Sequence, residues 1–186
     1  MKLPLAYYGD PILRQKAKLV DSITDDIRRL IADMSDTIGV NLGLAAPQVK
    51  QSLRIFLVCI PEYDENWREL APGKLEVFIN PKLSLPSGER VEMEEGCLSL
   101  PCLRVPVTRP AAIHYETMTL EGVVVEGCAV GLRARAIMHE NDHLNGKLTI
   151  DHLHGRARQY LNKDLNEIKK RYYLGGQIPP SNDEEV

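Results

Sequence analysis

Apolar residues recur at helical spacing at both ends of the chain. The N-terminal stretch predicts an amphipathic helix over residues 22–38, with Ser22 or Thr24 as its N-cap and Gly39 just past its end. The C-terminal stretch predicts a helix over residues 156–173. Its apolar positions at helical spacing are Tyr160, Leu161, Leu165, Ile168 and Tyr172.

The middle of the chain has the pattern of extended structure. Residues 53–60 form an apolar run rich in Ile, Val and Phe, and residues 77–79 and 112–116 have a similar character. A turn at residues 120–122 separates the last of these from the valines at 123–125. Because such a turn joins neighbouring strands, we expect a hairpin and an antiparallel sheet.

Composition limits the classes of protein that the chain can belong to. With 186 residues, 44% hydrophobic and 26% charged, we expect one domain over residues 1–174 and a flexible acidic tail over residues 175–186. A net charge of −3 does not produce the positive potential that attracts DNA. The chain also contains no apolar run of about 20 residues, the length needed to span a membrane. The first residues hold no signal-peptide core, so we expect a cytoplasmic protein.

A helix predicted over residues 130–144 carries His139, Glu140 and His143. Histidines four residues apart lie one above the other on a helix, so both can reach one metal ion. Glu140 is about 100° further round the helix and can reach a water molecule on that ion without being a ligand. The alternative is a chance match on a solvated helix face.

A catalytic site of this kind needs a third protein ligand and one open position. Cys97 is a candidate, because a glycine precedes it and Pro101 follows, which favours a defined backbone. For Cys59 and Cys128 we expect only small buried side chains. Cys102 could be a second sulfur ligand, but four ligands would make a closed structural zinc site in a non-enzymatic module.

A third motif, residues 43–48, is a run of small residues that ends in the amide side chain of Gln48. Taken alone it indicates only a close-packed turn. The gaps from this motif to Cys97 and on to His139 fit three segments that converge on one pocket.

Together, the motifs at residues 43–48, 95–99 and 139–143 resemble the three sequence motifs of the peptide deformylase family, and residues 8–14 look like it too. The resemblance covers most of residues 5–173. It implies an α+β fold, with antiparallel sheets around a central metal-binding helix and with an N-terminal and a C-terminal helix. It also implies an enzyme that removes the formyl group from N-formylmethionyl nascent peptides.

The resemblance implies a role for each candidate residue. One divalent metal ion would be held, with Fe²⁺ the favoured native ion and Zn²⁺, Ni²⁺ or Co²⁺ able to substitute. Glu140 would be the acid and base, while the Gln48 amide and the Leu98 N–H would bind the carbonyl oxygen. The implied metal ligands are Cys97, His139 and His143, and the implied substrate-binding residues are Gly43, Gly96 and Arg104.

Two positions depart from the family pattern. Asn41 stands where a glycine is common, and it can replace one there because asparagine tolerates left-handed backbone. Met138 replaces a glutamine before the first histidine, and core packing accounts for it. Neither position is an implied ligand. A metalloprotease is the nearest rival function, since the His-Glu-x-x-His helix serves peptide hydrolysis equally well, although Cys97 in its motif argues against it.

Other histidines and the basic C-terminal helix lie outside the three motifs. His114 and His152 receive no functional role. In the C-terminal helix basic residues outnumber Asp164 and Glu167, which indicates either a solvated face or docking on the ribosome. The basic residues are Arg156, Arg158, Lys163, Lys169, Lys170 and Arg171.

Overall fold

The computed structural model describes residues 1–64, 66 and 68–173. Over these residues the chain is α+β, as expected, with the helices α1 (Asp25–Ile38), α2 (Gly131–Leu144), α3 (Gly155–Tyr160) and α4 (Asn162–Ile168). Short helical turns are η1 (Pro11–Arg14), η2 (Ala46–Val49), η3 (Thr149–His152) and η4 (Lys169–Tyr173). The expected tail at residues 175–186 lies outside the described residues. No described helix is both long and apolar enough to cross a bilayer.

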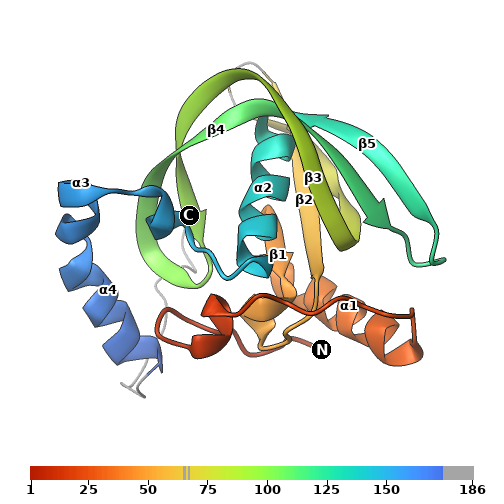
Figure 1. Cartoon of the computed structure of the whole chain (residues 1–186), viewed down its shortest axis with the longest axis horizontal. Helices are drawn as coiled ribbons and strands as arrows, with labels where there is room; N and C mark the ends of the chain where they lie inside the picture. The colour runs from red at the N-terminus through yellow and green to blue at the C-terminus, as the bar shows by residue number, and fades with distance from the viewer. Residues whose placement is uncertain (65, 67, 174–186) are drawn as a thin grey trace.

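The described strands form one five-stranded antiparallel sheet in the order β1-β2-β3-β4-β5. Figure 1 shows α2 in the middle of the molecule, with the long strands β3 and β4 curving around it. The antiparallel arrangement around α2 that the resemblance implied is therefore present. The strands are β1 (Gly43–Ala45), β2 (Ile55–Tyr63), β3 (Glu69–Cys97), β4 (Leu100–Met118) and β5 (Val124–Val130).

Strand β3 is far longer than the three residues expected at positions 77–79. The strand continues through Pro81 and Pro86, although proline cannot donate to a sheet ladder. In the structure these prolines fall between paired residues, where the β3–β4 register shifts. Asn80 and Leu85 directly precede Pro81 and Pro86 and have positive φ angles of 52° and 44°. These irregularities bend the strand without ending it.

Strand β2 is buried on both faces because helices α1 and α2 pack on opposite sides of the sheet. Phe56 and Val58 belong to the apolar cluster that contains residues of α2. Ile55 and Leu57 belong to a second cluster with Ile31 and other residues of α1. Because successive side chains of a strand point to opposite faces, one short strand serves both cores.

Helix α1 begins at Asp25, and Thr24 is its N-cap, since the Thr24 hydroxyl accepts a hydrogen bond from the Ile27 N–H at 3.4 Å. Gly39 follows the helix with φ 57°, as expected for a C-terminal glycine. Asn41 does not adopt left-handed backbone, so that expectation was wrong. Its side-chain amide instead donates to the Ile38 carbonyl at 2.7 Å and caps the helix end.

The single C-terminal helix expected over residues 156–173 is divided at Leu161, between α3 and α4. Leu165 and Ile168 of α4 are buried in a third apolar cluster with residues of β4 and η3, whereas no residue of α3 is buried. The two halves therefore face different surroundings. Figure 1 shows both at one side of the molecule.

Candidate active site

Helix α2 carries His139 and His143 one turn apart, as their spacing predicted. The two rings contact each other edge to face, with their centroids 5.2 Å apart. His143 is buried, and the neighbouring Met138 packs into the cluster between α2 and the sheet, as expected. The helix thus presents both imidazoles inside the protein, where a bound ion would be shielded from solvent.

Cys97 ends strand β3 and meets the two histidines. A tight turn at Leu98 and Ser99 places Cys97 opposite Leu100 of β4. The Cys97 Sγ atom lies 3.3 Å from His143 Nε2. Potential ligand atoms of Cys97, His139 and His143 all lie within 4.8 Å of one another. The structure therefore brings together the three predicted ligands, and Cys102 is not part of this group.

The donor set fits a divalent transition metal. Although burial raises the pKa of the Cys97 thiol, the nearby His143 and His139 lower it to about 5, which favours the thiolate that metals require. The His139 Nδ1 atom contacts Glu95 at 3.0 Å, which leaves Nε2 for an ion. One thiolate with two imidazoles suits Zn²⁺ and Fe²⁺ alike.

Glu140 lies beside this group and is only 4% exposed. Its Oε2 atom is buried and has no hydrogen-bond partner among the described residues. Burial raises its pKa to about 7, and Cys97 acts in the same direction, whereas His139 and His143 oppose the shift. A carboxyl group with this pKa can both accept and return a proton near neutral pH.

Gly43 is the residue of β1 that approaches Glu140. A Cβ atom at this position would lie 2.7 Å from the Cγ and Cδ atoms of Glu140. Such a contact is far shorter than van der Waals distance, so any side chain at Gly43 would displace the carboxylate. The small residue is needed here for proximity, since its φ is not positive.

Gln48 is buried in η2, and its amide has a fixed orientation. The Oε1 atom accepts the Ala45 N–H at 2.8 Å. The Nε2 atom consequently faces the candidate site, 3.6 Å from Cys97 Sγ and 3.4 Å from Ser99 Oγ. The motif at residues 43–48 is close-packed, as its composition indicated, and it also delivers an N–H donor to Cys97.

The other predicted site residues lie near the end of the β3–β4 hairpin. Leu98 follows Cys97 directly and is half-buried. Gly96 is exposed, and Arg104, also exposed, is its partner across the hairpin. Their positions agree with contact to a bound peptide, while the roles of Leu98, Gly96 and Arg104 stay predictions.

Glu95 is a buried residue of the site to which the sequence interpretation gave no role. It receives two hydrogen bonds from Arg109, at 2.7 and 2.9 Å, and one from Arg135 at 2.7 Å. Burial raises its pKa, but hydrogen bonds from His139 and Arg109 outweigh that effect and keep it well below its usual range. An ionised Glu95 can therefore fix the ring orientation of His139, as carboxylates do for metal-binding histidines.

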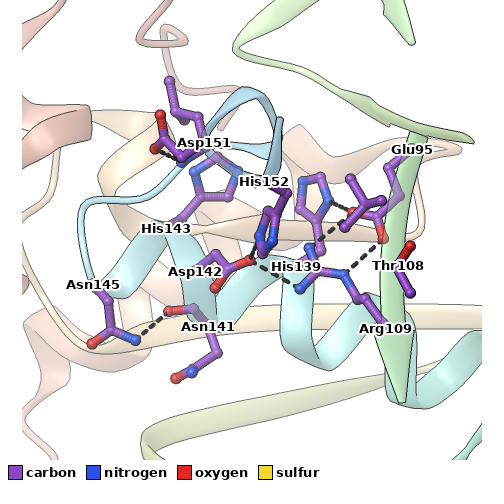
Figure 2. A network of polar contacts seen from close by, with 12 residues as sticks. Glu95, Thr108, Arg109, His139, Asn141, Asp142, His143, Asn145, Asp151 and His152 are labelled. Carbon is purple, nitrogen blue, oxygen red and sulfur yellow. Dashed lines mark hydrogen bonds and ion pairs between the residues drawn. The ribbon is translucent and has the colours of Figure 1, made fainter. Parts of the chain in front are cut away.

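The network continues from Arg109 to a second carboxylate. Arg109 NH1 donates to Asp142 Oδ2 at 2.9 Å, and His152 Nε2 contacts the same oxygen at 2.8 Å. Figure 2 shows this chain of contacts from His139 through Glu95 and Arg109 to Asp142 and His152. The sequence interpretation gave His152 no functional role, and the structure adds that its ring contacts Asp142.

Two cysteines differ in their surroundings. Cys59 is half-buried against the cluster beneath α1, close to the small buried side chain expected. Cys128 is exposed, so the same expectation was wrong for it. It lies on β5, directly opposite His114 of β4, and its Sγ atom is 3.4 Å from His114 Nε2. An edge strand exposes the outward face on which Cys128 falls.

The mixed fold and the largely buried Cys-His-His group beside a carboxylate are typical of metal-dependent hydrolases. A sequence model described as polypeptide deformylase matches residues 2–159. The chain belongs to the polypeptide deformylase family, and it is an enzyme that removes the N-formyl group from nascent peptides. The metalloprotease and the non-enzymatic zinc module are therefore set aside.

Individual relatives and solved structures agree with this assignment. A peptide deformylase of Acinetobacter baumannii is 39% identical over 171 residues, which cover 91% of this chain and 93% of the relative. One from Chlorobaculum parvum is 41% identical over 174 residues, covering 91% and 89%. The crystal structure of peptide deformylase from Ehrlichia chaffeensis has a TM-score of 0.82 at 32% identity, covering 94% of this chain and 100% of that one.

Proposed function

We propose that this chain hydrolyses N-formylmethionyl peptides at one divalent ion held by Cys97, His139 and His143. The observation that carries the proposal is the convergence of these three side chains within 4.8 Å. A divalent ion at this place would polarise the formyl carbonyl and lower the pKa of water. By resemblance to the family the native ion is Fe²⁺, and Zn²⁺, Ni²⁺ or Co²⁺ can replace it.

In this proposal Glu140 moves the proton. Its carboxylate takes a proton from the water molecule that attacks the formyl carbon and then delivers it to the amine nitrogen as the C–N bond breaks. Formate and a free methionine amine result. The support is the burial of Glu140 beside Cys97 and His139, together with its raised pKa.

The Gln48 amide and the Leu98 backbone N–H stabilise the negative charge that develops on the formyl oxygen. The support for Gln48 is its orientation, because the Ala45 N–H holds Oε1 and so turns Nε2 toward Cys97. Leu98 is placed by the tight turn that follows Cys97. Donors that are fixed before the reaction lose little energy in reorganising.

The peptide is proposed to bind as an added strand. Among the described residues, strand β1, which contains Gly43, pairs only with β2, so its other edge is open there. A peptide paired with that edge would lie beside Glu140. Gly96 and Arg104, at the end of the β3–β4 hairpin, would contact the same peptide from its other side.

One assay tests the proposed function: formate release from a formyl-methionyl peptide, measured beside internal cleavage of the same peptide. We expect formate release only, its loss on chelation, and its return with Fe²⁺, Ni²⁺ or Co²⁺. Internal cleavage without formate would overturn the proposal in favour of a protease.

We further propose that the enzyme works in the cytoplasm and docks on the ribosome through its basic C-terminal segment. Lys163 and Lys170 are exposed there. Exchanging both for glutamate should weaken salt-sensitive co-sedimentation with ribosomes, whereas the same exchange at the exposed Lys2 and Lys16 should not. Equal binding by all variants would leave only the solvated-face interpretation.

A further inference from the structure

The contact network of the site ends at a histidine that lies outside all three sequence motifs. His152 belongs to η3, beyond the end of α2, and is about one-third exposed. Its Nε2 atom lies 2.8 Å from Asp142 Oδ2, and Figure 2 shows the ring turned toward that carboxylate. His152 is thus connected to the ligand His139 through three intervening side chains.

Arg109 connects the two carboxylates of this network, Asp142 and Glu95. The guanidinium is 5% exposed and bonds two carboxylates at once, Glu95 through Nε and NH2 and Asp142 through NH1. Asp142 Oδ2 accepts from both Arg109 and His152. A shift of Asp142 would therefore move the guanidinium and disturb its two hydrogen bonds to Glu95, the carboxylate that contacts His139 Nδ1 and that Arg135 also holds at 2.7 Å.

The segment that carries His152 is itself anchored. Ile150 is fully buried in the third apolar cluster. Asp151 accepts the Leu148 N–H at 2.9 Å and forms an ion pair with Arg14 from the N-terminal segment. Because its neighbours are fixed, the ring of His152 can hold Asp142 in place rather than follow it.

We propose that His152 is a positioning residue for the metal centre, which acts by donating a hydrogen bond to Asp142 and so fixes Arg109, Glu95 and the ring of His139. The inference rests on the proposed function, since it assumes that His139 is a ligand. Partners that contact a metal-binding histidine directly contribute about 10–100-fold to metal affinity or activity. His152 is further away, so its contribution is smaller, about threefold to tenfold.

The test compares two substitutions of similar size in the full chain. His152→Leu removes the donor, while His152→Gln keeps an N–H near the position of Nε2. We expect His152→Leu to bind Co²⁺ about threefold to tenfold more weakly in competition with a chromophoric chelator, and to alter the visible spectrum of the Co²⁺ form. His152→Gln should restore both. His154→Ala, an exposed histidine two residues away, is the control and should match the wild type.

Wild-type affinity and spectrum in folded His152→Leu would overturn the proposal, and so would an equal loss in His154→Ala or no restoration by His152→Gln. If His152→Leu does not fold, His152→Glu, which offers Asp142 only acceptors, should show the same loss, and wild-type affinity there would also overturn it. Failure of the proposed function looks different, because the wild type itself would then bind no metal or release no formate.

Discussion

Two cysteine–histidine pairs in this molecule have nearly the same shortest sulfur–nitrogen distance and different surroundings. Cys97 Sγ lies 3.3 Å from His143 Nε2, and Cys128 Sγ lies 3.4 Å from His114 Nε2. The first pair has His139 as a third potential ligand. Among the residues that the structure describes, no third ligand group joins the second pair.

The two pairs differ in the burial of their side chains and in the contacts that hold them. His143 is buried, and His139 is held by Glu95, whereas Cys128 and His114 are both exposed on the outer face of a hairpin. Exposed side chains keep their rotamer freedom, so ordering them around an ion costs entropy that the buried group has already lost on folding. A short distance between sulfur and nitrogen therefore does not by itself make a metal site.

The largest expected effect comes from removing a ligand of the buried group. His143→Ala should lose metal and deformylation together, because only Cys97 and His139 remain to hold the ion. The measurement is metal content per chain by elemental analysis beside formate release. A variant that kept one ion per chain and its activity would show that His143 is not a ligand.

The next effect separates holding the ion from using it. Glu140→Ala should keep one metal ion per chain and lose activity by about 10²–10⁴-fold, since one residue serves both proton transfers. Turnover and metal content are measured on the same sample. A folded but metal-free Glu140→Ala would make Glu140 a ligand and remove the proposed base.

The sequence indicated the buried group because each part of it lies within a short motif. The period of one helix made His139 and His143 candidates, the neighbours of Cys97 made it a candidate, and the family resemblance implied the three as ligands. The same local logic misjudged Cys128, because an isolated cysteine gives no indication of which face of an edge strand it will occupy.

The supporting network was not predictable from such local patterns. Arg109 reaches Glu95 only through the β3–β4 register, in which Glu95 pairs with Val105 and Arg109 with Val91. That stretch of the register adjoins a shift between Gly96 and Cys97 at the end of the hairpin, which no pattern in the sequence indicated. His152 meets Asp142 only because η3 folds back after α2.

The smallest expected effect concerns the exposed pair. Cys128→Ser and His114→Ala should each leave metal content and formate release within about twofold of wild type, as surface changes away from a site usually do. Cys97→Ser is the matched control, because it makes the same chemical change in the buried group and should lose the ion. Elemental analysis of the three variants at equal metal loading decides between the two pairs. If Cys128→Ser lost one equivalent of metal while Cys97→Ser kept it, the exposed pair would be the metal site, and burial with a carboxylate behind the ligands would not be what distinguishes them.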